Sequence, residues 1–329
     1  MDHERMLIAG GYADAGAAGL YRLRHADGRL TVEGIIASVC NVSGGVRRGD
    51  RWYLVDETAG DIVVLDADRE WREVARFASG GDAPCHLALN AAADLLAVAN
   101  YGDGATALFA LDDRGKPVGA PDRYRHDGSG PVANRQEGPH AHWVGFAPDG
   151  TLYATDLGSD CVLAFTPGRD RLGTARVVYT APPGSGPRQI AFHLGLPILY
   201  LVSELASTLT VLDVGADGML IARQIISTLP DGVDDDSLAG ALLLAGDRLY
   251  VTNRGHDSVA TFAIGAGGDV RPIGHRASGG VSPRFLLIDG DYLLVAHEQS
   301  GGVTALPLDA GPVASRADIP GAAFLGETP

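Results

Sequence analysis

One short pattern recurs seven times along the chain and constrains its fold more than any other feature. Its clearest copy is an apolar segment at residues 249–254, a short polar turn, and a second apolar segment at residues 258–262. The copies begin at Met6, Trp52, Leu96, Leu152, Leu199, Leu249 and Leu293, with 44 to 56 residues between consecutive starts. A β-type unit repeating at about that period is typical of one propeller blade, so seven copies predict an all-β, seven-bladed β-propeller.

The same repeats bear on domain organisation. A chain of 329 residues could hold two domains, but a closed ring of repeats is one domain whatever its length. We therefore expect residues 1–329 to form a single propeller domain. Glycine accounts for 45 residues, roughly twice the usual share, which fits a chain with many tight turns.

Each repeat is interpreted as two adjacent antiparallel strands of a blade. The first is apolar throughout, as expected for a strand buried between neighbouring blades. An apolar segment about ten residues earlier is expected to be the innermost strand, as at residues 85–89, 142–146, 189–192, 239–244 and 285–288. A weaker outer strand should follow each unit, as at residues 177–179 and 224–227.

The two ends of the chain predict how the ring closes. The first unit starts at Met6, which leaves no room for an innermost strand before it. Residues 321–325 are an apolar segment left over after the seventh unit. We expect this tail to supply the missing inner strand of the first blade, because closure removes free sheet edges. A disordered tail is the alternative.

Charge and hydropathy narrow the classes of partner. The net charge of −15 argues against nucleic acid and against anionic membrane surfaces. No apolar stretch approaches 18 residues, and the N-terminus lacks the apolar run of a signal peptide, so we expect a cytoplasmic protein with no membrane contact. A closed propeller leaves no edge for strand pairing, which predicts a monomer. Cys40, Cys85 and Cys161 show no CxxC spacing and are expected to be small buried hydrophobes.

Propeller geometry gathers two sets of residues around the mouth of the central channel. Entries to the innermost strands supply His86, His140, His142, Arg188, Gln189 and Arg284. Positions five residues after the unit starts supply Glu57, Tyr101, Leu157, Glu204, Arg254 and Glu298. Arginine donates paired hydrogen bonds to carboxylate, phosphate or oxyanion groups, and His and Glu move protons near neutral pH. The mouth is therefore predicted to bind an anionic or carbonyl-bearing small molecule.

Simpler interpretations remain open for these residues. Charged groups at a channel mouth often only solvate the opening. His140 and His142, spaced as HxH, can bond to loop backbone or point the same way as metal ligands do. No third or fourth ligand is evident beside them, so neither a metal nor a cofactor is expected. The acidic run at residues 231–236 lacks the spacing of a calcium loop and is expected to be solvated. Cys85 and His86 should face opposite ways on a strand.

Several segments together resemble the seven-bladed β-propeller lactonase family, which includes propeller-type 6-phosphogluconolactonases and fungal carboxy-muconate lactonizing enzymes. The resembling stretches are Pro84-Cys85-His86-Leu87, Val98-Ala99-Asn100-Tyr101-Gly102, Gly138-Pro139-His140-Ala141-His142, Asp156-Leu157-Gly158-Ser159-Asp160, Gly184-Ser185-Gly186-Pro187-Arg188, Glu204-Leu205-Ala206-Ser207-Thr208, Asn253-Arg254-Gly255-His256-Asp257-Ser258 and Ser282-Pro283-Arg284. They run in order along the chain and are specific as a set.

The resemblance implies an active site made of the His of a PHxH motif, the Arg of a PRH motif, a downstream Glu and the Arg of an NRG motif. The matching residues are His140 (with His142 as the close competitor), Arg188, Glu204 and Arg254. We assign His86, Tyr101, His142, Gln189, Arg284 and Glu298 to substrate binding. The chain departs from the family pattern at Gln189, where a His is usual, and at His297-Glu298-Gln299.

The expected reaction is hydrolysis of a sugar-derived or other acidic lactone. Arg188 and Arg254 would hold the anionic group and stabilise the oxyanion that forms when water attacks the ring carbonyl. His140 or Glu204 would take the proton from that water. A carboxylate flanked by two arginines has a depressed pKa, which favours a histidine as the base. Cycloisomerisation of an unsaturated diacid to a lactone, and a non-catalytic propeller that binds a ligand or a protein, are the alternatives.

Overall fold

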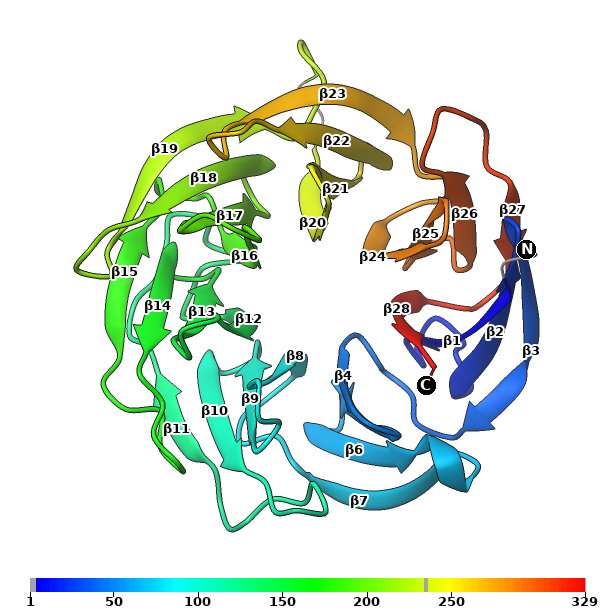
Figure 1. Cartoon of the computed structure of the whole chain (residues 1–329), viewed down its shortest axis with the longest axis horizontal. Coiled ribbons are helices and arrows are strands. Elements are labelled where there is room, and N and C mark those ends of the chain that lie inside the picture. Colours follow the sequence, from blue (N-terminus) through cyan, green and yellow to red (C-terminus); the bar gives the residue numbers. More distant parts are fainter. Residues whose placement is uncertain (1–3, 234–235, 329) are drawn as a thin grey trace.

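A computed structural model describes residues 4–233 and 236–328, which form seven four-stranded antiparallel sheets arranged in a ring (Figure 1). These seven sheets confirm the predicted seven-bladed propeller. The acidic run at residues 231–236, expected to be a solvated loop, includes Asp234 and Asp235, which lie outside the described residues. The only helical element in the described part of the chain is the short 3-10 turn Ala67–Arg69.

Blades are numbered here in chain order, and each is given from its innermost to its outermost strand. Blade 1 holds β28 (Ala322–Glu327), β1 (Glu4–Gly11), β2 (Leu20–Ala26) and β3 (Arg29–Ala37), and blade 2 holds β4 (Gly45–Arg48), β5 (Arg51–Asp56), β6 (Asp61–Asp66) and β7 (Arg72–Ala78). Blade 3 holds β8 (Pro84–Leu89), β9 (Leu95–Asn100), β10 (Ala105–Ala110) and β11 (Asp122–Arg125), and blade 4 holds β12 (Ala141–Phe146), β13 (Leu152–Asp156), β14 (Cys161–Phe165) and β15 (Arg176–Thr180).

The remaining three blades repeat the same order. Blade 5 holds β16 (Pro187–Phe192), β17 (Ile198–Ser203), β18 (Thr208–Val214) and β19 (Leu220–Ser227). Blade 6 holds β20 (Leu238–Ala245), β21 (Arg248–Arg254), β22 (Ser258–Ile264) and β23 (Val270–Ala277). Blade 7 holds β24 (Pro283–Asp289), β25 (Tyr292–His297), β26 (Val303–Pro307) and β27 (Ser315–Ala317). The expected inner and outer strands are all present.

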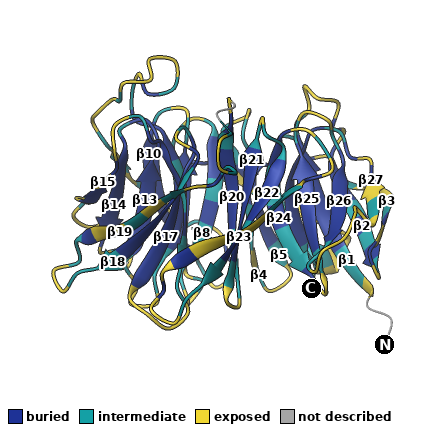
Figure 2. Cartoon of the chain, turned by 90° about the horizontal axis from the view of Figure 1, so that it is seen from above, coloured by how far each residue is buried: buried dark blue, intermediate teal, exposed yellow. Residues whose placement is uncertain are grey.

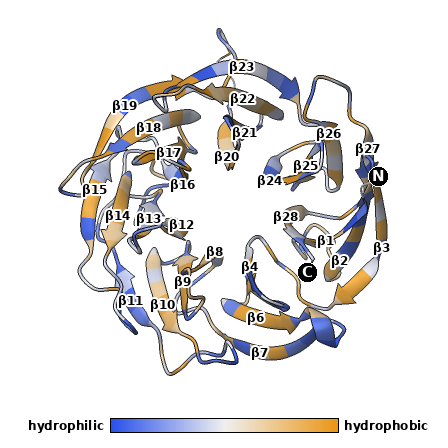
Figure 3. Cartoon of the chain, in the orientation of Figure 1, coloured by the Kyte–Doolittle hydropathy of each residue, from blue (hydrophilic) through white to orange (hydrophobic). Residues whose placement is uncertain are grey.

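The second strands of the blades are largely buried, as their apolar sequences predict. Every residue of β9 and of β17 is buried, whereas the outer strands β19 and β23 carry long exposed stretches (Figure 2). Hydropathy follows the same gradient, from apolar β9 and β10 to hydrophilic β11 (Figure 3). Neighbouring blades pack face to face through their buried second and third strands. Burial of apolar side chains between blades is therefore the main stabilising contribution of the fold.

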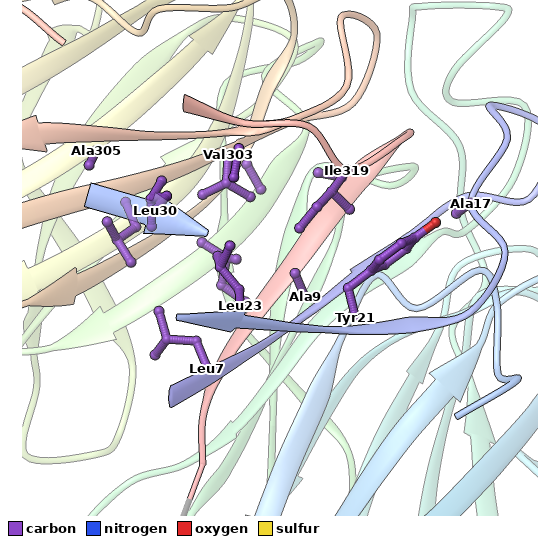
Figure 4. Close-up of a cluster of buried hydrophobic side chains, with 14 residues drawn as sticks. Leu7, Ala9, Ala17, Tyr21, Leu23, Leu30, Val303, Ala305 and Ile319 are labelled. Carbon is purple, nitrogen blue, oxygen red and sulfur yellow. The ribbon is translucent and has the colours of Figure 1, made fainter. Parts of the chain in front are cut away.

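The ring closes through the C-terminal segment, as the sequence predicts. Strand β28 pairs antiparallel with β1, and Leu325 lies opposite Ala9. Side chains of blade 1, such as Leu7 and Leu23, then pack against Val303 and Ala305 of blade 7 (Figure 4). The apolar tail is therefore an integral strand of the first blade, and blades 1 and 7 share a core as the other neighbours do.

Six innermost strands carry an irregularity that the hydrophobic pattern does not reveal. The strand pairing shifts register near the start of β8, β12, β16, β20, β24 and β28. The extra residue is Cys85, His142, Arg188, Arg284 or Ala323 in five of these strands, and β20 has Gly240 and Ala241 there. A bulge takes one residue out of the ladder and re-aims its side chain. Three of the predicted site residues are thus placed by bulges.

The described part of the chain contains no helix with the length and hydropathy needed to cross a membrane.

Candidate active site

The carboxylate of Glu204 lies at the centre of a cluster of three arginines. Glu204 directly follows β17 and is 1 % exposed. Its Oε2 atom contacts Nη1 of Arg188 and lies 2.6 Å from Nη2 of Arg254, while its Oε1 atom lies 2.5 Å from Nη2 of Arg135. Arg188 comes from the bulge of β16, Arg254 ends β21, and Arg135 belongs to the loop before β12. Residues of three blades therefore meet at one carboxylate.

The charges of this cluster do not cancel. Burial alone would raise the pKa of Glu204, but the charges of Arg254, Arg188 and Arg135 together hold it well below its usual range. Glu204 is therefore ionised at neutral pH, and both of its oxygen atoms are occupied. Three guanidinium groups against one carboxylate leave two positive charges in excess. The buried Nε of Arg254 has no hydrogen-bond partner among the described residues, so a donor remains free for an anion.

His142 supports the cluster as a neutral ring. Its Nε2 atom contacts Nη1 of Arg188 and lies 3.8 Å from Oε2 of Glu204. Because a guanidinium N–H only donates, Nε2 must accept, and the ring carries no charge. Burial and the charge of Arg188 lower the pKa of His142 well below its ordinary value, which agrees with this assignment. The lone pair of His142 is thus used to hold Arg188.

His140 is oriented differently and keeps a lone pair available. Its Nδ1 atom lies 2.8 Å from the backbone carbonyl oxygen of Tyr101, which only accepts, so Nδ1 carries the hydrogen. In the neutral ring Nε2 then carries the lone pair; it lies 3.4 Å from the exposed carboxylate of Glu137, which can accept a hydrogen bond from Nε2 only when the ring is protonated. The ring stacks on Tyr101 with centroids 4.6 Å apart, and the Tyr101 ring also meets His142 edge-on at 5.5 Å. The two histidines therefore make different contacts: Nδ1 of His140 donates to Tyr101, and Nε2 of His142 accepts from Arg188.

A second polar cluster lies across the mouth. Nη1 of Arg284 is 3.2 Å from Oε2 of Glu298, and its guanidinium carbon lies 5.3 Å from the centre of the Tyr12 ring. The Tyr12 hydroxyl donates to Glu57 at 2.9 Å, and the Ser43 hydroxyl donates to the same carboxylate. A cavity of about 170 Å³ joins the clusters, since Ser43, His142, Arg188 and Arg284 all line it. Arg254 and Glu298 also line an open hollow of about 810 Å³.

Comparison with known proteins agrees with this fold. Residues 6–312 match the family model described as lactonase, seven-bladed beta-propeller. The chain belongs to the seven-bladed β-propeller lactonase family. A 6-phosphogluconolactonase of Bacillus subtilis is 31% identical over 216 residues, which are 64% of this chain and 59% of that protein. This match thus spans about six-tenths of the relative's length.

Two solved structures resemble this lactonase-family propeller over almost its whole length. The periplasmic gluconolactonase of Pseudomonas aeruginosa superposes with a TM-score of 0.89 and 27% identity, covering 99% of this chain and 100% of that chain. A protein from Lactobacillus plantarum gives a TM-score of 0.88 at 25% identity, covering 99% of each chain. The fold and its family are therefore established over the full ring.

The predicted site residues of this lactonase-family chain fall into two groups. His140, Arg188, Glu204 and Arg254 come together with Tyr101 and His142, and Arg284 pairs with Glu298 on the other side of the cavity. Gln189 lines the cavity, but its amide exchanges two hydrogen bonds of 3.0 Å with the backbone of Leu242. It can reach a ligand only by giving up the bonds that tie β16 to β20.

His86 and Cys85 line the cavity without forming a reactive pair. Burial lowers the pKa of His86 to about 4, so its ring is neutral, and its Nδ1 has no partner in the described residues. The thiol of Cys85 donates to the carbonyl oxygen of His142 at 3.2 Å. Burial raises the pKa of this thiol, and a protonated thiol is a poor nucleophile.

Sequence reasoning missed Arg135 and Tyr12, and both lie outside the repeat alignment. Arg135 belongs to the loop of residues 126–140, which is held by the buried side chain of Gln136 through its bond of 2.9 Å to the carbonyl of Leu157. The interval from Leu96 to Leu152 is the longest between repeat starts, and this extra length was the only sequence feature that indicated an additional loop there. Tyr12 follows β1 in the first repeat, one position beyond the aligned residue.

Proposed function

We propose that the chain hydrolyses a sugar-derived or acidic lactone at the channel mouth. The observation that carries the proposal is the buried carboxylate of Glu204 with its three arginines, which leaves two positive charges in excess and a buried Arg254 Nε without a partner among the described residues. Such a cluster suits a carboxylate or phosphate group and a developing oxyanion. Family membership and relatives named 6-phosphogluconolactonase and gluconolactonase support the same reaction class.

In this mechanism Arg188 and Arg254 bind the anionic group of the substrate and the oxyanion. Nε2 of His140 removes a proton from a water molecule as that water attacks the ring carbonyl carbon. The tetrahedral intermediate collapses, the ring C–O bond breaks, and the proton on His140 passes to the departing ring oxygen. The product is a hydroxy acid. Glu204 touches no reacting atom in this scheme; it is a positioning residue that holds the three guanidinium groups together.

The substrate preference should follow the excess positive charge. Lactones with a phosphate or carboxylate group should be preferred over neutral gluconolactone, because an anion neutralises the arginine cluster. Five further residues surround the same cavity or mouth and remain assigned to substrate binding: His86, Tyr101, Gln189, Arg284 and Glu298. A cytoplasmic location, a monomeric state, and the absence of nucleic-acid and membrane partners stay predictions from the sequence.

A pH-indicator assay on a panel of lactones tests the proposal. The panel contains gluconolactone, 6-phosphogluconolactone and carboxy-muconolactones, with wild type, Arg254→Ala and the control Arg69→Ala, whose side chain is 71% exposed in blade 2. We expect turnover of an anionic lactone that falls at least about 10²-fold in Arg254→Ala and is unchanged in Arg69→Ala. Equal rates in all three proteins would place the reaction elsewhere.

The opposite reaction, cyclisation of an unsaturated diacid, would use the same groups. Arg188 and Arg284 line the same cavity, Arg254 lines the open hollow, and these cationic groups would suit the two ends of a diacid. Loss of the ultraviolet absorbance of a diene diacid, with no hydrolysis of any lactone, would identify this reaction. Tight lactone binding with no turnover of either kind would indicate a binding protein.

A further inference from the structure

Three side chains that could bind a metal, two of them buried, lie between blades 3 and 4, apart from the arginine cluster. His126 directly follows β11, Asp156 ends β13, and Cys161 begins β14. One potential ligand atom of each residue lies within 4.8 Å of the other two. Asp156 and Cys161 are opposite one another in the β13–β14 hairpin, so their side chains share one face of the sheet.

Two atoms of this group are buried and lack partners. Asp156 is 1 % exposed, and its Oδ1 accepts hydrogen bonds from the backbone N–H groups of His140, Gly158 and Ser159 at 2.8, 3.0 and 3.1 Å. Its other oxygen, Oδ2, has no hydrogen-bond partner in the described part of the chain, and neither has the buried Nδ1 of His126. Buried polar atoms are normally satisfied, so an unpartnered acceptor beside an unpartnered ring nitrogen calls for a ligand.

Two other interfaces between blades fill this position with a hydroxyl and an amide. Between blades 2 and 3, the hydroxyl of Ser79, which follows β7, donates to Oδ1 of Asn100 at 2.6 Å. Between blades 5 and 6, Thr228, which follows β19, donates to Oδ1 of Asn253 at 2.7 Å. A hydroxyl and an amide thus close the space with a direct hydrogen bond.

Between blades 3 and 4 the same positions hold different chemistry. His126 takes the place of Ser79 and Thr228, and Asp156 takes the place of Asn100 and Asn253. Cys161 stands where β10 begins with Ala105 and β22 begins with Ser258. The repeat has therefore replaced a self-contained hydrogen bond with an imidazole, a carboxylate and a thiol.

We propose that this space binds a Zn²⁺ ion, with His126, Asp156 and Cys161 as ligands and a water molecule as the fourth. Imidazole nitrogen, thiolate sulfur and carboxylate oxygen are the ligand types that zinc takes in proteins. The thiol proton of Cys161 leaves to solvent on binding, so the two charges of the ion are balanced by one thiolate and one carboxylate. A tetrahedral zinc ion holds its ligand atoms roughly 3.6 Å apart, so small side-chain rotations complete the site.

The ion would fasten the loop that carries Arg135 and His140. This loop starts at His126, a ligand, and ends at His140, whose backbone N–H is bonded to the other oxygen of Asp156. A metal ion at Asp156 therefore ties both ends of the loop to the β13–β14 hairpin. The site is a structural one, because none of its three ligands lines the cavity between the polar clusters.

Cobalt(II) substitution tests the site without reference to activity. The protein is treated with chelator, dialysed and titrated with Co²⁺, then with Zn²⁺, while absorbance and thermal unfolding are followed. We expect one equivalent of Co²⁺ to give a sulfur-to-cobalt charge-transfer band and tetrahedral d–d bands, which Zn²⁺ abolishes by displacement. Either metal should raise the unfolding temperature of the wild type.

Two variants and one control test two of the proposed ligands. Cys161→Ser should lose the charge-transfer band, while Cys40→Ser, which alters a half-buried cysteine in another blade, should keep it. Asp156→Asn, which retains an oxygen for the backbone hydrogen bonds, should bind the metal at least about tenfold more weakly while unfolding near the wild-type temperature in chelator. A wild type with no such band and no metal-dependent rise in unfolding temperature would overturn the proposal. So would a band that survives in Cys161→Ser.

Discussion

The guanidinium group of Arg254 lies 2.6 Å from the carboxylate of Glu204, although the two residues belong to neighbouring blades. Arg254 ends β21 and Glu204 directly follows β17, the second strands of their blades. The contact therefore depends on the angle between the blades rather than on local structure. The same carboxylate also holds Arg188 and Arg135. One buried anion thus links the loop before β12 to blades 5 and 6.

Replacement of this anion should destabilise the fold and the site together. Glu204→Gln leaves three guanidinium groups in mutual repulsion, and removal of one partner from a buried ion pair typically costs about 3–5 kcal/mol. We expect a loss of that size in the free energy of unfolding measured with urea, together with a strong loss of lactone turnover. Glu73→Gln removes a carboxylate 3.1 Å from Arg76 on the surface and should cost no more than about 1 kcal/mol. Equal losses in the two variants would contradict the account.

Substitution of His140 and of His142 should have different effects on the steady-state kinetic constants. His140→Asn removes the proposed base, so kcat should fall by about 10²-fold or more while KM changes little. His142→Asn removes the acceptor that holds Arg188, so its main effect should be a higher KM for anionic lactones. Steady-state kinetics on an anionic and a neutral lactone distinguish the two roles. An unchanged kcat in His140→Asn would return the base assignment to His142 or to a water network.

Acid should destabilise the protein through buried neutral histidines. Burial lowers the pKa of His297 to about 4, as it does for His86, whereas a histidine in an unfolded chain titrates near 6.5. Between these values the unfolded chain binds the proton and the folded protein does not, so stability falls as pH drops from about 6.5 to about 4. Each histidine contributes on the order of 3 kcal/mol over that range.

Urea unfolding of wild type and His297→Gln at several pH values measures this effect. The variant should show a shallower loss of stability over the same interval. Leu194→Ala truncates an apolar side chain that is 81% exposed and removes no titrating group, so it should retain the wild-type slope. Parallel curves for wild type and His297→Gln would show that this histidine is protonated equally in both states.

The strand that closes the ring should be as sensitive as any core strand. Phe324 of β28 is 2 % exposed and packs edge-on against Phe285 and Trp52, with ring centroids 5.2 and 5.9 Å away. Phe324→Ala should therefore cost about 3–5 kcal/mol in the free energy of unfolding. Val118→Ala truncates a side chain that is 61% exposed and should change it by less than about 0.5 kcal/mol. A small effect of Phe324→Ala would mean that β28 detaches readily.

The fold could be predicted because its determinants recur in the sequence. Each blade needs a strand buried on both faces, so the same kind of apolar segment occurs at seven places, from Met6 to Leu293. Closure was also predictable, since residues 321–325 are apolar and no eighth unit needs them. Burial between blades thus fixes both the number of blades and the way the ring closes.

Much of the candidate site was predictable for the same reason, because repeat positions at the mouth converge in space. Arg188, Glu204 and Arg254 could be found in this way. The bulges could not, because one extra residue in a strand leaves the hydrophobic pattern almost unchanged. Arg135 and the group of His126, Asp156 and Cys161 could not be found either. Arg135 lies in a loop that has no equivalent in the other repeats. The three proposed metal ligands are spread over two blades, and they occupy positions that hold ordinary hydrogen-bonding residues in other repeats.

The pairing of β28 with β1 also sets the order in which the molecule can be completed. Strand β1 emerges early in synthesis, but its inner neighbour consists of residues 322–327 and emerges only after all seven repeats. Until then blades 2 to 6 can bury their shared faces in succession, while β1 offers an unpaired edge to any other nascent chain. The nascent protein thus remains an open arc, and the interface between blades 1 and 7 forms in its final step.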